Sequence, residues 1–399
     1  MAYITEFSIE GLAGRDAPYA QKLNRDVNVF FGPNGSGKTT LLKILHSAMS
    51  KDTSILPGLA FKSATITIYS AARKNHFTLT CSKDTDRGPE RTAEGLPSAP
   101  TLFGDDTPVD LSKPAWTSRL PRSLREKLEW GIVAPADDPD VANIRWSHQY
   151  LPTARLYREI PGLERKTSGR SEEELDKHYA AIMQRVWRDY TADVNSSIRE
   201  IQDRGLREII RNLLADVNEA ERAEEPFEAH ETYQRVSRFL KRQQTLEDVL
   251  GPEDQFVRRY NEDSRVRASV RAIEGVERKI ASVMRPQEKL RDLIQGMFAG
   301  GKAVTFGEKE IEISVKDKEK IDLPSLSSGE KHLLLICIQT LMAESNSLII
   351  DEPELSMHID WQHKLVSSLQ QLNPAMQLIA ATHSPEIMAD LPDDKIFRL

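Results

Sequence analysis

The segment Gly32–Thr39 constrains the fold of this chain more than any other part of the sequence. It reads Gly-Pro-Asn-Gly-Ser-Gly-Lys-Thr, follows the apolar run Val27–Phe31 directly and precedes the helix-prone stretch Thr40–Met49. Glycines in such a loop let backbone N–H groups approach an anion closely, and the start of the following helix adds partial positive charge. The sequence therefore predicts a phosphate-binding loop in an α/β domain.

Within this loop, the two last side chains carry the expected chemistry of an ATP site. Lys38 is predicted to reach the β and γ phosphates, and Thr39 to ligate Mg²⁺. The residues predicted to contact the nucleotide here are Asn34, Gly35, Ser36, Gly37, Lys38, Thr39 and Thr40. The alternative is a glycine turn that happens to precede Lys-Thr, and the strand before the loop argues against it.

A second motif places two acids directly after a buried strand. Leu348–Ile350 is an apolar run, and Asp351 and Glu352 follow it. Acids at the carboxyl edge of a parallel sheet stand where open α/β folds bind their ligands. We expect Asp351 to hold the Mg²⁺ shell and Glu352 to orient and deprotonate the attacking water. The alternative is an acidic pair that only caps a turn.

Two further segments complete the pattern. The apolar run Gln377–Ala381 ends at Thr382-His383-Ser384, and Leu326–Glu330 precedes a strongly apolar helix candidate. At that helix start, Ser327 and Gly329 would offer a hydroxyl and backbone N–H groups to an anion. Read alone, this segment is equally an ordinary helix N-cap, and a lone histidine is commonly a plain loop residue.

The order and spacing of the four segments resemble the ABC-type ATPases. The resemblance implies that Ser327 and Gly329 form a signature loop that closes over the nucleotide of a second protomer. It also implies that His383 is the switch histidine that contacts the γ-phosphate. Gln149 resembles the Q-loop residue that touches Mg²⁺, with plain surface as the alternative. The sequence departs from the common signature at Ser328, where a second glycine is usual, and at Glu330, where glutamine is frequent.

The distance between the glycine loop and the signature implies a discontinuous head with an insertion. We expect an α/β head of ABC type, with a mixed sheet and an antiparallel layer, formed by residues 1–150 and 301–399. Residues 151–300 are predicted to be an inserted helical hairpin or bundle, because apolar residues recur there at spacings of three and four. Pro286 is expected to interrupt the second of its long helices. Prolines recur over residues 84–143, which are predicted to be rich in loops.

Three segments are expected to form strands of the antiparallel layer, and the composition indicates where the protein is located and what it binds. Ile4–Glu10, Ala64–Tyr69 and Phe77–Cys81 alternate as strands do. The chain contains only two cysteines and no long apolar run or secretory signal, which predicts a cytoplasmic protein that does not enter the membrane. Its formal net charge is −7, and basic and acidic residues are interspersed in the insertion. A surface that clamps DNA would show an excess of one sign.

A closer resemblance rests on Asp351-Glu352-Pro353-Glu354, the following Leu-Ser-Met-His and Thr382-His383-Ser384-Pro385. These look like the SMC-like ATPases of prokaryotic antiphage systems, such as the ATPase part of overcoming-lysogenization-defect nucleases and the ATPases of the Septu and PARIS systems. The resemblance implies an ATP-hydrolysing sensor or switch that forms head-to-tail homo-oligomers. It also implies control of a separate effector, a TOPRIM- or HNH-type nuclease, with a phage protein or DNA as the trigger.

Two other classes remain open from the sequence. A DNA-repair ATPase of the RecF or SMC type would clamp DNA, and DNA would stimulate its ATP hydrolysis. A transporter ATPase subunit would have a much shorter helical insertion and an aromatic residue for adenine, for which Tyr19 is the nearby candidate.

Overall fold

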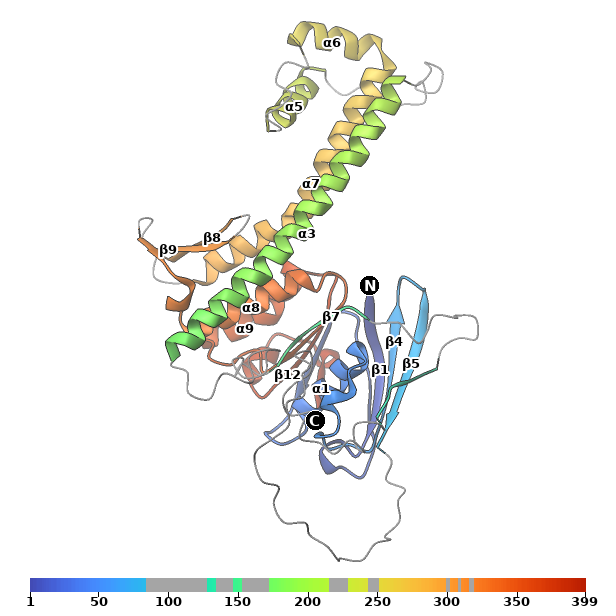
Figure 1. Ribbon diagram of the computed structural model, residues 1–399, viewed down its shortest axis with the longest axis vertical. Helices are drawn as coiled ribbons and strands as arrows, with labels where there is room; N and C mark the ends of the chain where they lie inside the picture. The colour runs from blue at the N-terminus through green and yellow to red at the C-terminus, as the bar shows by residue number, and fades with distance from the viewer. Residues whose placement is uncertain are drawn as a thin grey trace, which may run out of the picture. The chain divides into compact units, whose positions relative to one another are not determined.

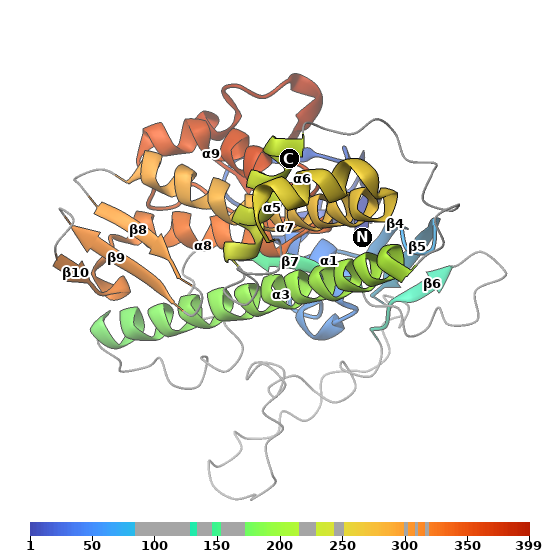
Figure 2. The same ribbon diagram turned by 90° about the horizontal axis from the view of Figure 1, so that it is seen from above.

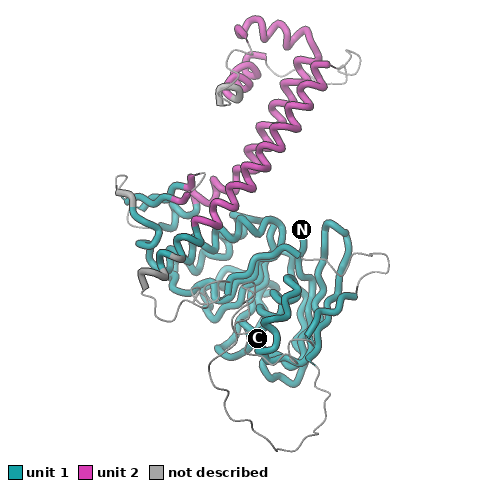
Figure 3. The backbone as a smooth tube through the Cα atoms, viewed as in Figure 1, with its two compact units in different colours: residues 1–183, 293–305, 312–399 teal, residues 184–292, 306–311 magenta. Residues whose placement is uncertain are grey.

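The computed structural model describes residues 1–83, 128–133, 146–152, 172–214, 229–242, 251–298, 302–307, 310–315 and 319–399. Most of the predicted loop-rich stretch 84–143 therefore lies outside the described residues. The chain forms two compact units, shown in Figure 3. Unit 1 comprises residues 1–183, 293–305 and 312–399, and unit 2 comprises residues 184–292 and 306–311. These divisions differ from the predicted ones at 150 and 300.

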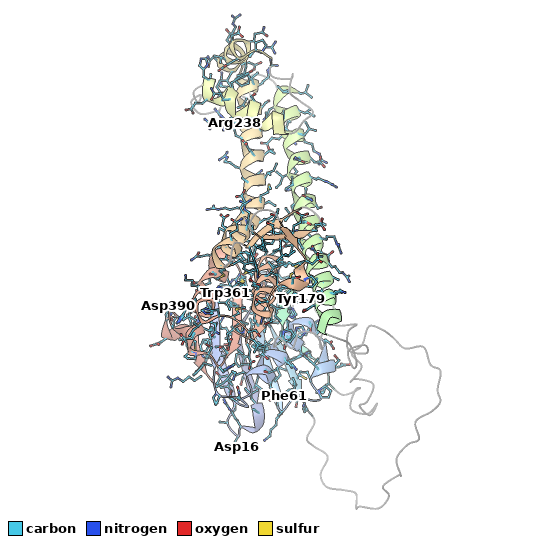
Figure 4. All side chains as sticks on the ribbon, turned by 90° about the vertical axis from the view of Figure 1, so that its left-hand side faces the viewer. Asp16, Phe61, Tyr179, Arg238, Trp361 and Asp390 are labelled. Carbon is cyan, nitrogen blue, oxygen red and sulfur yellow. The ribbon has the colours of Figure 1, made fainter. Side chains whose placement is uncertain are left out.

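The units divide inside two long helices. Helix α3 (Glu172–Leu214) leaves unit 1 after its first turns, and α7 (Ser264–Met297) returns to it. The first turns belong to unit 1 because Tyr179 packs there, with 4% of its surface exposed and its hydroxyl donating to the Lys331 carbonyl oxygen. Figure 4 labels this tyrosine on the helix. The units therefore divide within α3, and the insertion boundary at residue 150 stays a prediction.

The central sheet of unit 1 is parallel and has the strand order β13-β3-β12-β11-β7. Its strands are β3 (Val27–Phe31), β7 (His148–Leu151), β11 (Ser347–Asp351), β12 (Gln377–Thr382) and β13 (Ile396–Arg398). Every residue of β11 and β12 is buried, as is typical of parallel strands covered on both faces. The register pairs Asp351 with Ala381 and Thr382 with Phe31. Three predicted motifs thus meet at one sheet edge.

The predicted antiparallel layer is confirmed as a second sheet with the order β2-β1-β4-β5-β6. Its strands are β1 (Ala2–Glu10), β2 (Tyr19–Lys22), β4 (Ser63–Ser70), β5 (Asn75–Ser82) and β6 (Gly131–Val133). Figure 1 shows helix α1 (Lys38–Ser50) between the two sheets. Its buried Leu41, Leu42 and Leu45 belong to one core with residues of both sheets.

A fully buried glutamine connects the two sheets. The Gln377 amide donates to the carbonyl oxygens of Ile4 (2.7 Å) and Asn24 (2.8 Å), and its Oε1 accepts from the Ile4 backbone (3.0 Å) and the Ser347 hydroxyl (2.8 Å). A buried amide is tolerated when its donors and acceptors are all used. These bonds fix where β12 enters the sheet, and hence where it delivers His383.

Helices α8 (Ser328–Met342) and α9 (Ile359–Leu372) lie on the other side of the parallel sheet from α1 (Figure 1). The returning end of α7 reaches α9, where the rings of Phe298 and Trp361 stack at 6.3 Å. A third, small sheet has the order β10-β9-β8 (Figure 2). It contains β8 (Lys302–Phe306), β9 (Ile311–Val315) and β10 (Glu319–Ile321). The predicted α/β class is confirmed.

Unit 2 is helical, as predicted for the insertion. Helices α3 and α7 approach closely at Gly205, where an added Cβ would lie 2.0 Å from a methyl group of Val276. Helices α5 (Ala229–Arg242) and α6 (Glu253–Glu262) form a separate small core with α7 around Tyr260. The expectation that Pro286 interrupts a helix is wrong, since α7 continues through it. One proline removes a single backbone bond, and the packing of Leu290 and Ile294, both fully buried, holds the turns that follow.

Both cysteines, Cys81 and Cys337, are buried free thiols. In the described part of the chain, no helix combines the length and apolar character needed to cross a membrane.

Candidate nucleotide site

The glycine loop has the backbone conformation that its sequence predicts. Gly35 and Gly37 have φ of 81° and 99°, which side-chain-bearing residues rarely adopt. An added Cβ on Gly37 would also lie 2.9 Å from the Cβ of Ala13. The Lys38 ammonium folds back over the loop and donates to the carbonyl oxygens of Gly32 (2.7 Å) and Pro33 (3.1 Å). The glycine loop thus holds a charged hydrogen-bond donor, the Lys38 ammonium, against its own backbone.

Thr39 and Asp351 meet although they are far apart in the sequence. The Thr39 hydroxyl donates to Asp351 Oδ2 at 2.7 Å. Thr39 lies in the first turn of the helix after β3 and Asp351 ends β11, and β12 lies between these two strands, so the contact spans the carboxyl edge between β3 and β11. Asp351 is only 1% exposed. A hydroxyl and a carboxylate oxygen, held together at a phosphate-binding loop, are the protein ligands that Mg²⁺ takes in nucleotide sites.

Glu352 follows Asp351 in a left-handed backbone conformation, with φ of 49°. Its amide donates to the Ala381 carbonyl oxygen (2.8 Å), which fixes the turn to the neighbouring strand. This turn brings Glu352 Oε1 to 3.6 Å from Nδ1 of His383. Strained backbone at a site edge is typical of functional positions, where surrounding structure holds it. The predicted base and the predicted switch histidine are therefore neighbours.

A second glutamate, Glu354, contacts the same histidine and was not predicted as a site residue. Its Oε1 accepts from the Thr382 hydroxyl (2.5 Å) and the His383 amide (3.3 Å), and lies 3.5 Å from His383 Nδ1. The sequence held one signal for it, because Glu354 lies two residues after Glu352 and an intervening proline marks a turn.

The signature segment forms a helix cap. Ser327 caps α8 by accepting from the Glu330 amide (3.2 Å), and Glu330 accepts from the Ser327 amide in return (2.8 Å), a complete capping box. An added Cβ on Gly329 would lie 2.3 Å from the Ser356 carbonyl oxygen, so only glycine allows α8 to approach the 355–358 loop. Ser327 and Ser328 are exposed. Within the described residues, no hydrogen bond joins Ser327 or Gly329 to the glycine loop.

Glu330, noted as a departure from the common signature, has a second partner. Both its carboxylate oxygens lie 2.8 Å from the Lys302 ammonium on β8. Burial alone would raise the pKa of Glu330, but Lys302 and the Ser327 amide outweigh it and hold that pKa below its usual value. A glutamine could keep the cap but not the ion pair.

His332, one turn into α8, connects the signature helix to the 355–358 loop. Its Nδ1 lies 3.1 Å from the Leu355 carbonyl oxygen, so this nitrogen carries a proton and donates. Only 5% of the residue is exposed. Burial lowers the pKa of His332 to about 4, although the Leu355 carbonyl acts in the opposite direction. The imidazole is therefore neutral near pH 7.

Gln149 stands apart from the other predicted site residues. The register pairs it with Leu348, three residues before Asp351 on the adjacent strand. At roughly 3.3 Å per residue, this places it about 10 Å back from the sheet edge along the strand. Its role as a Mg²⁺ ligand stays a prediction that the register does not favour. Its neighbour His148 instead contacts α1, with Nε2 lying 2.7 Å from Nδ1 of His46.

The fold and the grouping of Lys38, Thr39, Asp351, Glu352 and His383 define a P-loop nucleotide-binding head with a helical insertion. The chain belongs to the family described as "AAA domain, putative AbiEii toxin, Type IV TA system", whose sequence model matches residues 186–389, just over half of the chain. That match covers the signature, the acidic strand end and the histidine, whereas the glycine loop precedes it.

Individual relatives are distant. A segment of 95 residues is 30% identical to the retron Vc95 probable ATPase of Vibrio cholerae serotype O1 biovar El Tor, which is 21% of this chain and 18% of that protein. The chain thus matches about a fifth of this curated relative. The Smc head domain with an extended coiled coil of Pyrococcus furiosus gives a TM-score of 0.42 at 13% identity over 98% of this chain and 92% of that one. The Smc head with coiled coil and joint of Pyrococcus yayanosii gives 0.40 at 14% identity over 98% and 93%.

Proposed function

We propose that this chain binds and hydrolyses ATP at the carboxyl edge of its parallel sheet. The observation that carries the proposal is the 2.7 Å bond from Thr39 to Asp351, with Glu352 and His383 next to it. Bound Mg²⁺ would supply positive charge that offsets the negative charge of the phosphates. The Thr39 hydroxyl and the Asp351 carboxylate fit that ion as protein ligands.

The protein's own groups have separable tasks. Lys38, now on the carbonyl oxygens of its own loop, exchanges them for phosphate oxygens of higher charge. Glu352 orients the attacking water and takes its proton, because its side chain is 22% exposed and reaches the edge. His383 contacts the terminal phosphate from the neighbouring strand.

We further infer that hydrolysis requires a second copy of the chain. Ser327 and Ser328 are exposed at the start of α8, a position with partial positive charge, and among the described residues neither makes a hydrogen bond to the glycine loop of its own copy. Head-to-tail pairing would place Ser327 and Gly329 of one protomer on the nucleotide held by the other. The homo-oligomer is therefore part of the proposal.

The biological role that we propose is a switch in antiphage defence. The family description names a toxin–antitoxin system, and the distant relative is a retron ATPase. Within unit 1, the insertion's root is bonded to the signature helix: Asp176 Oδ1 lies 2.6 Å from Lys331 Nζ, and Tyr179 donates to the Lys331 carbonyl oxygen. A signal received by the helical insertion would act on the ATP site through these bonds. The effector would be a separate protein, which we propose to be a TOPRIM- or HNH-type nuclease in the cytoplasm, with a phage protein or DNA as the trigger.

The experiment is a comparison of wild type, Glu352→Gln and Glu344→Gln, the last being an exposed glutamate outside the site. We expect phosphate release from ATP by wild type and Glu344→Gln, and a loss of two or more orders of magnitude in Glu352→Gln. Light scattering after size exclusion should show larger assemblies with a non-hydrolysable ATP analogue in all three. Equal turnover in Glu352→Gln would reject the base, and a strictly monomeric wild type with analogue would reject the shared site.

A further inference from the structure

The second glutamate of the acidic segment is buried against the switch histidine. Only 4% of Glu354 is exposed, against 22% of the Glu352 side chain. Its Oε1 is within 3.5 Å of three groups of the next strand's end: the Thr382 hydroxyl, the His383 amide and His383 Nδ1. A carboxylate placed so deeply has no path to an attacking water, so it cannot replace Glu352 as the base.

The hydrogen bonds around Thr382 direct its proton to this carboxylate. Thr382 Oγ1 accepts the Ser384 amide at 2.9 Å, and its own proton then points to Glu354 Oε1, 2.5 Å away. A buried carboxylate is costly unless such donors compensate it. Ser384 is held in turn, since its hydroxyl donates to Gln362 Oε1 at 2.8 Å. The network fixes Glu354 and the backbone that carries His383 together.

Two carboxylate oxygens therefore face one nitrogen of the histidine. Glu354 Oε1 lies 3.5 Å and Glu352 Oε1 3.6 Å from His383 Nδ1. An unprotonated nitrogen would direct its lone pair at both negative groups, so the proton resides on Nδ1. Nε2 is then the ring nitrogen left for a ligand. Carboxylate partners commonly set the tautomer and orientation of a functional imidazole in this way.

We propose that Glu354 is a positioning residue for the ATPase reaction: it holds His383 with Nδ1 protonated and Nε2 presented to the terminal phosphate. Glu352 cannot hold the ring alone, because it must turn to the water during hydrolysis. Glu354, buried and bonded to Thr382, does not move with it. The inference rests on the proposed ATP hydrolysis, but the state of the ring can be measured without turnover.

The first test is ¹⁵N NMR of the full-length protein labelled in its histidine rings, with His383 assigned by its loss in His383→Gln. In nucleotide-free wild type, we expect the shift of a protonated nitrogen at Nδ1 and of an unprotonated or exchange-averaged one at Nε2. In Glu354→Ala, the proton should redistribute toward Nε2. A wild-type ring with its proton on Nε2 alone overturns the proposal, whatever the variants do.

The second test compares steady-state kinetics of Glu354→Ala, Glu354→Gln and the control Glu386→Gln. The control removes the charge from another histidine–carboxylate pair close in sequence, His363 Nε2 to Glu386 Oε2 at 2.7 Å, outside the site. We expect kcat to fall roughly 10- to 100-fold in Glu354→Ala with KM within about threefold. Glu354→Gln keeps an acceptor oxygen and should recover most of that loss, and the control should match wild type.

The outcomes separate the two levels of inference. Unchanged kcat per folded molecule in Glu354→Ala, with folding checked by circular dichroism and by binding of an ATP analogue, overturns the positioning role. If Glu354→Ala does not fold, Glu354→Gln provides the test. A His383 tautomer unchanged from wild type, with kcat within about tenfold of the wild-type value, supports the positioning role. A His383 ring protonated on Nε2, with wild-type kcat, rejects it. A wild type that shows the Nδ1 proton but hydrolyses no ATP instead refutes the proposed function.

Discussion

Acid should weaken unit 1 through the buried histidine of the signature helix. Burial lowers the pKa of His332 from 6.5 to about 4, so between these values the unfolded chain binds a proton that the folded chain excludes. Stability therefore falls as the pH drops below about 6.5, and this effect is complete near pH 4. Burial and the neighbouring His148 also lower the pKa of His46 to about 4, with the same sign.

The size of the effect follows from those two values. For one site that titrates at about 4 when folded and about 6.5 when unfolded, linkage gives a loss of about 2 kcal/mol between pH 7 and pH 5. The lowered pKa of Glu330 acts only at more acidic values, because a carboxylate contributes its stability down to its folded pKa. The window between pH 7 and pH 5 thus isolates the histidines.

The assay is urea unfolding of unit 1, followed by a tryptophan signal at pH 7 and pH 5, in wild type and His332→Asn. Asparagine retains a donor for the Leu355 carbonyl oxygen and does not titrate. We expect the variant to lose about 2 kcal/mol less than wild type between the two pH values. The control His76→Asn, at an exposed strand position, should follow wild type. Identical pH dependence of wild type and His332→Asn would refute the reasoning.

Three further substitutions, one of them with a matched control, test contacts at defined points. Gly329→Ala forces a Cβ to 2.3 Å from the Ser356 carbonyl oxygen and should lower stability by about 1–3 kcal/mol and abolish assembly with an ATP analogue, measured by thermal melting and size exclusion. The Cβ added by Gly205→Ala would lie 2.0 Å from a Val276 methyl group and should destabilise the pair of helices α3 and α7. The Cβ added by Gly275→Ala on the same pair meets nothing within 4 Å and should stabilise the protein by about 0.5–1 kcal/mol. Equal shifts of the melting temperature in the two variants would contradict this. Asp176→Asn leaves the buried Lys331 ammonium without its carboxylate and should cost about 2 kcal/mol by urea unfolding, while an unchanged midpoint would show that the pair is dispensable.

The site motifs could be predicted from the sequence because each of them is a short continuous segment. The glycine loop, the acids after Ile350 and the histidine after Ala381 each follow an apolar run, and the adjacency of parallel strands makes their meeting foreseeable. Glu354 was missed because a buried polar role depends on Thr382, which is close only across the sheet. Periodicity could not locate the division between the two units either, since α3 continues unbroken past Tyr179, which packs in unit 1.

At Pro286, too, a rule based on local sequence fails because it does not include tertiary packing. A proline inside a helical pattern is a breaker by local rules, yet α7 continues because Leu290 and Ile294 are buried beyond it. Local propensity favours an end there, and tertiary packing outweighs the loss of one backbone bond. The register of β7 is likewise a tertiary property, and it is what separates Gln149 from the edge that its sequence position suggested.

Four consecutive residues at the start of α8 together contact three other segments of unit 1. Gly329 touches the backbone of Ser356, Glu330 pairs with Lys302 on β8, Lys331 pairs with the root of α3, and His332 bonds to Leu355. Two of the four contacts go to the 355–358 loop that follows Asp351 and Glu352. A displacement of the root of α3 would therefore move the first turn of α8, which follows Ser327, and that turn could not move without the 355–358 loop. If Ser327 closes on the nucleotide of a second copy, this first turn of α8 connects that closure with the root of the insertion. Asp176→Asn removes one of the connecting contacts, so it should weaken any effect of a trigger on ATP turnover more than it weakens basal turnover.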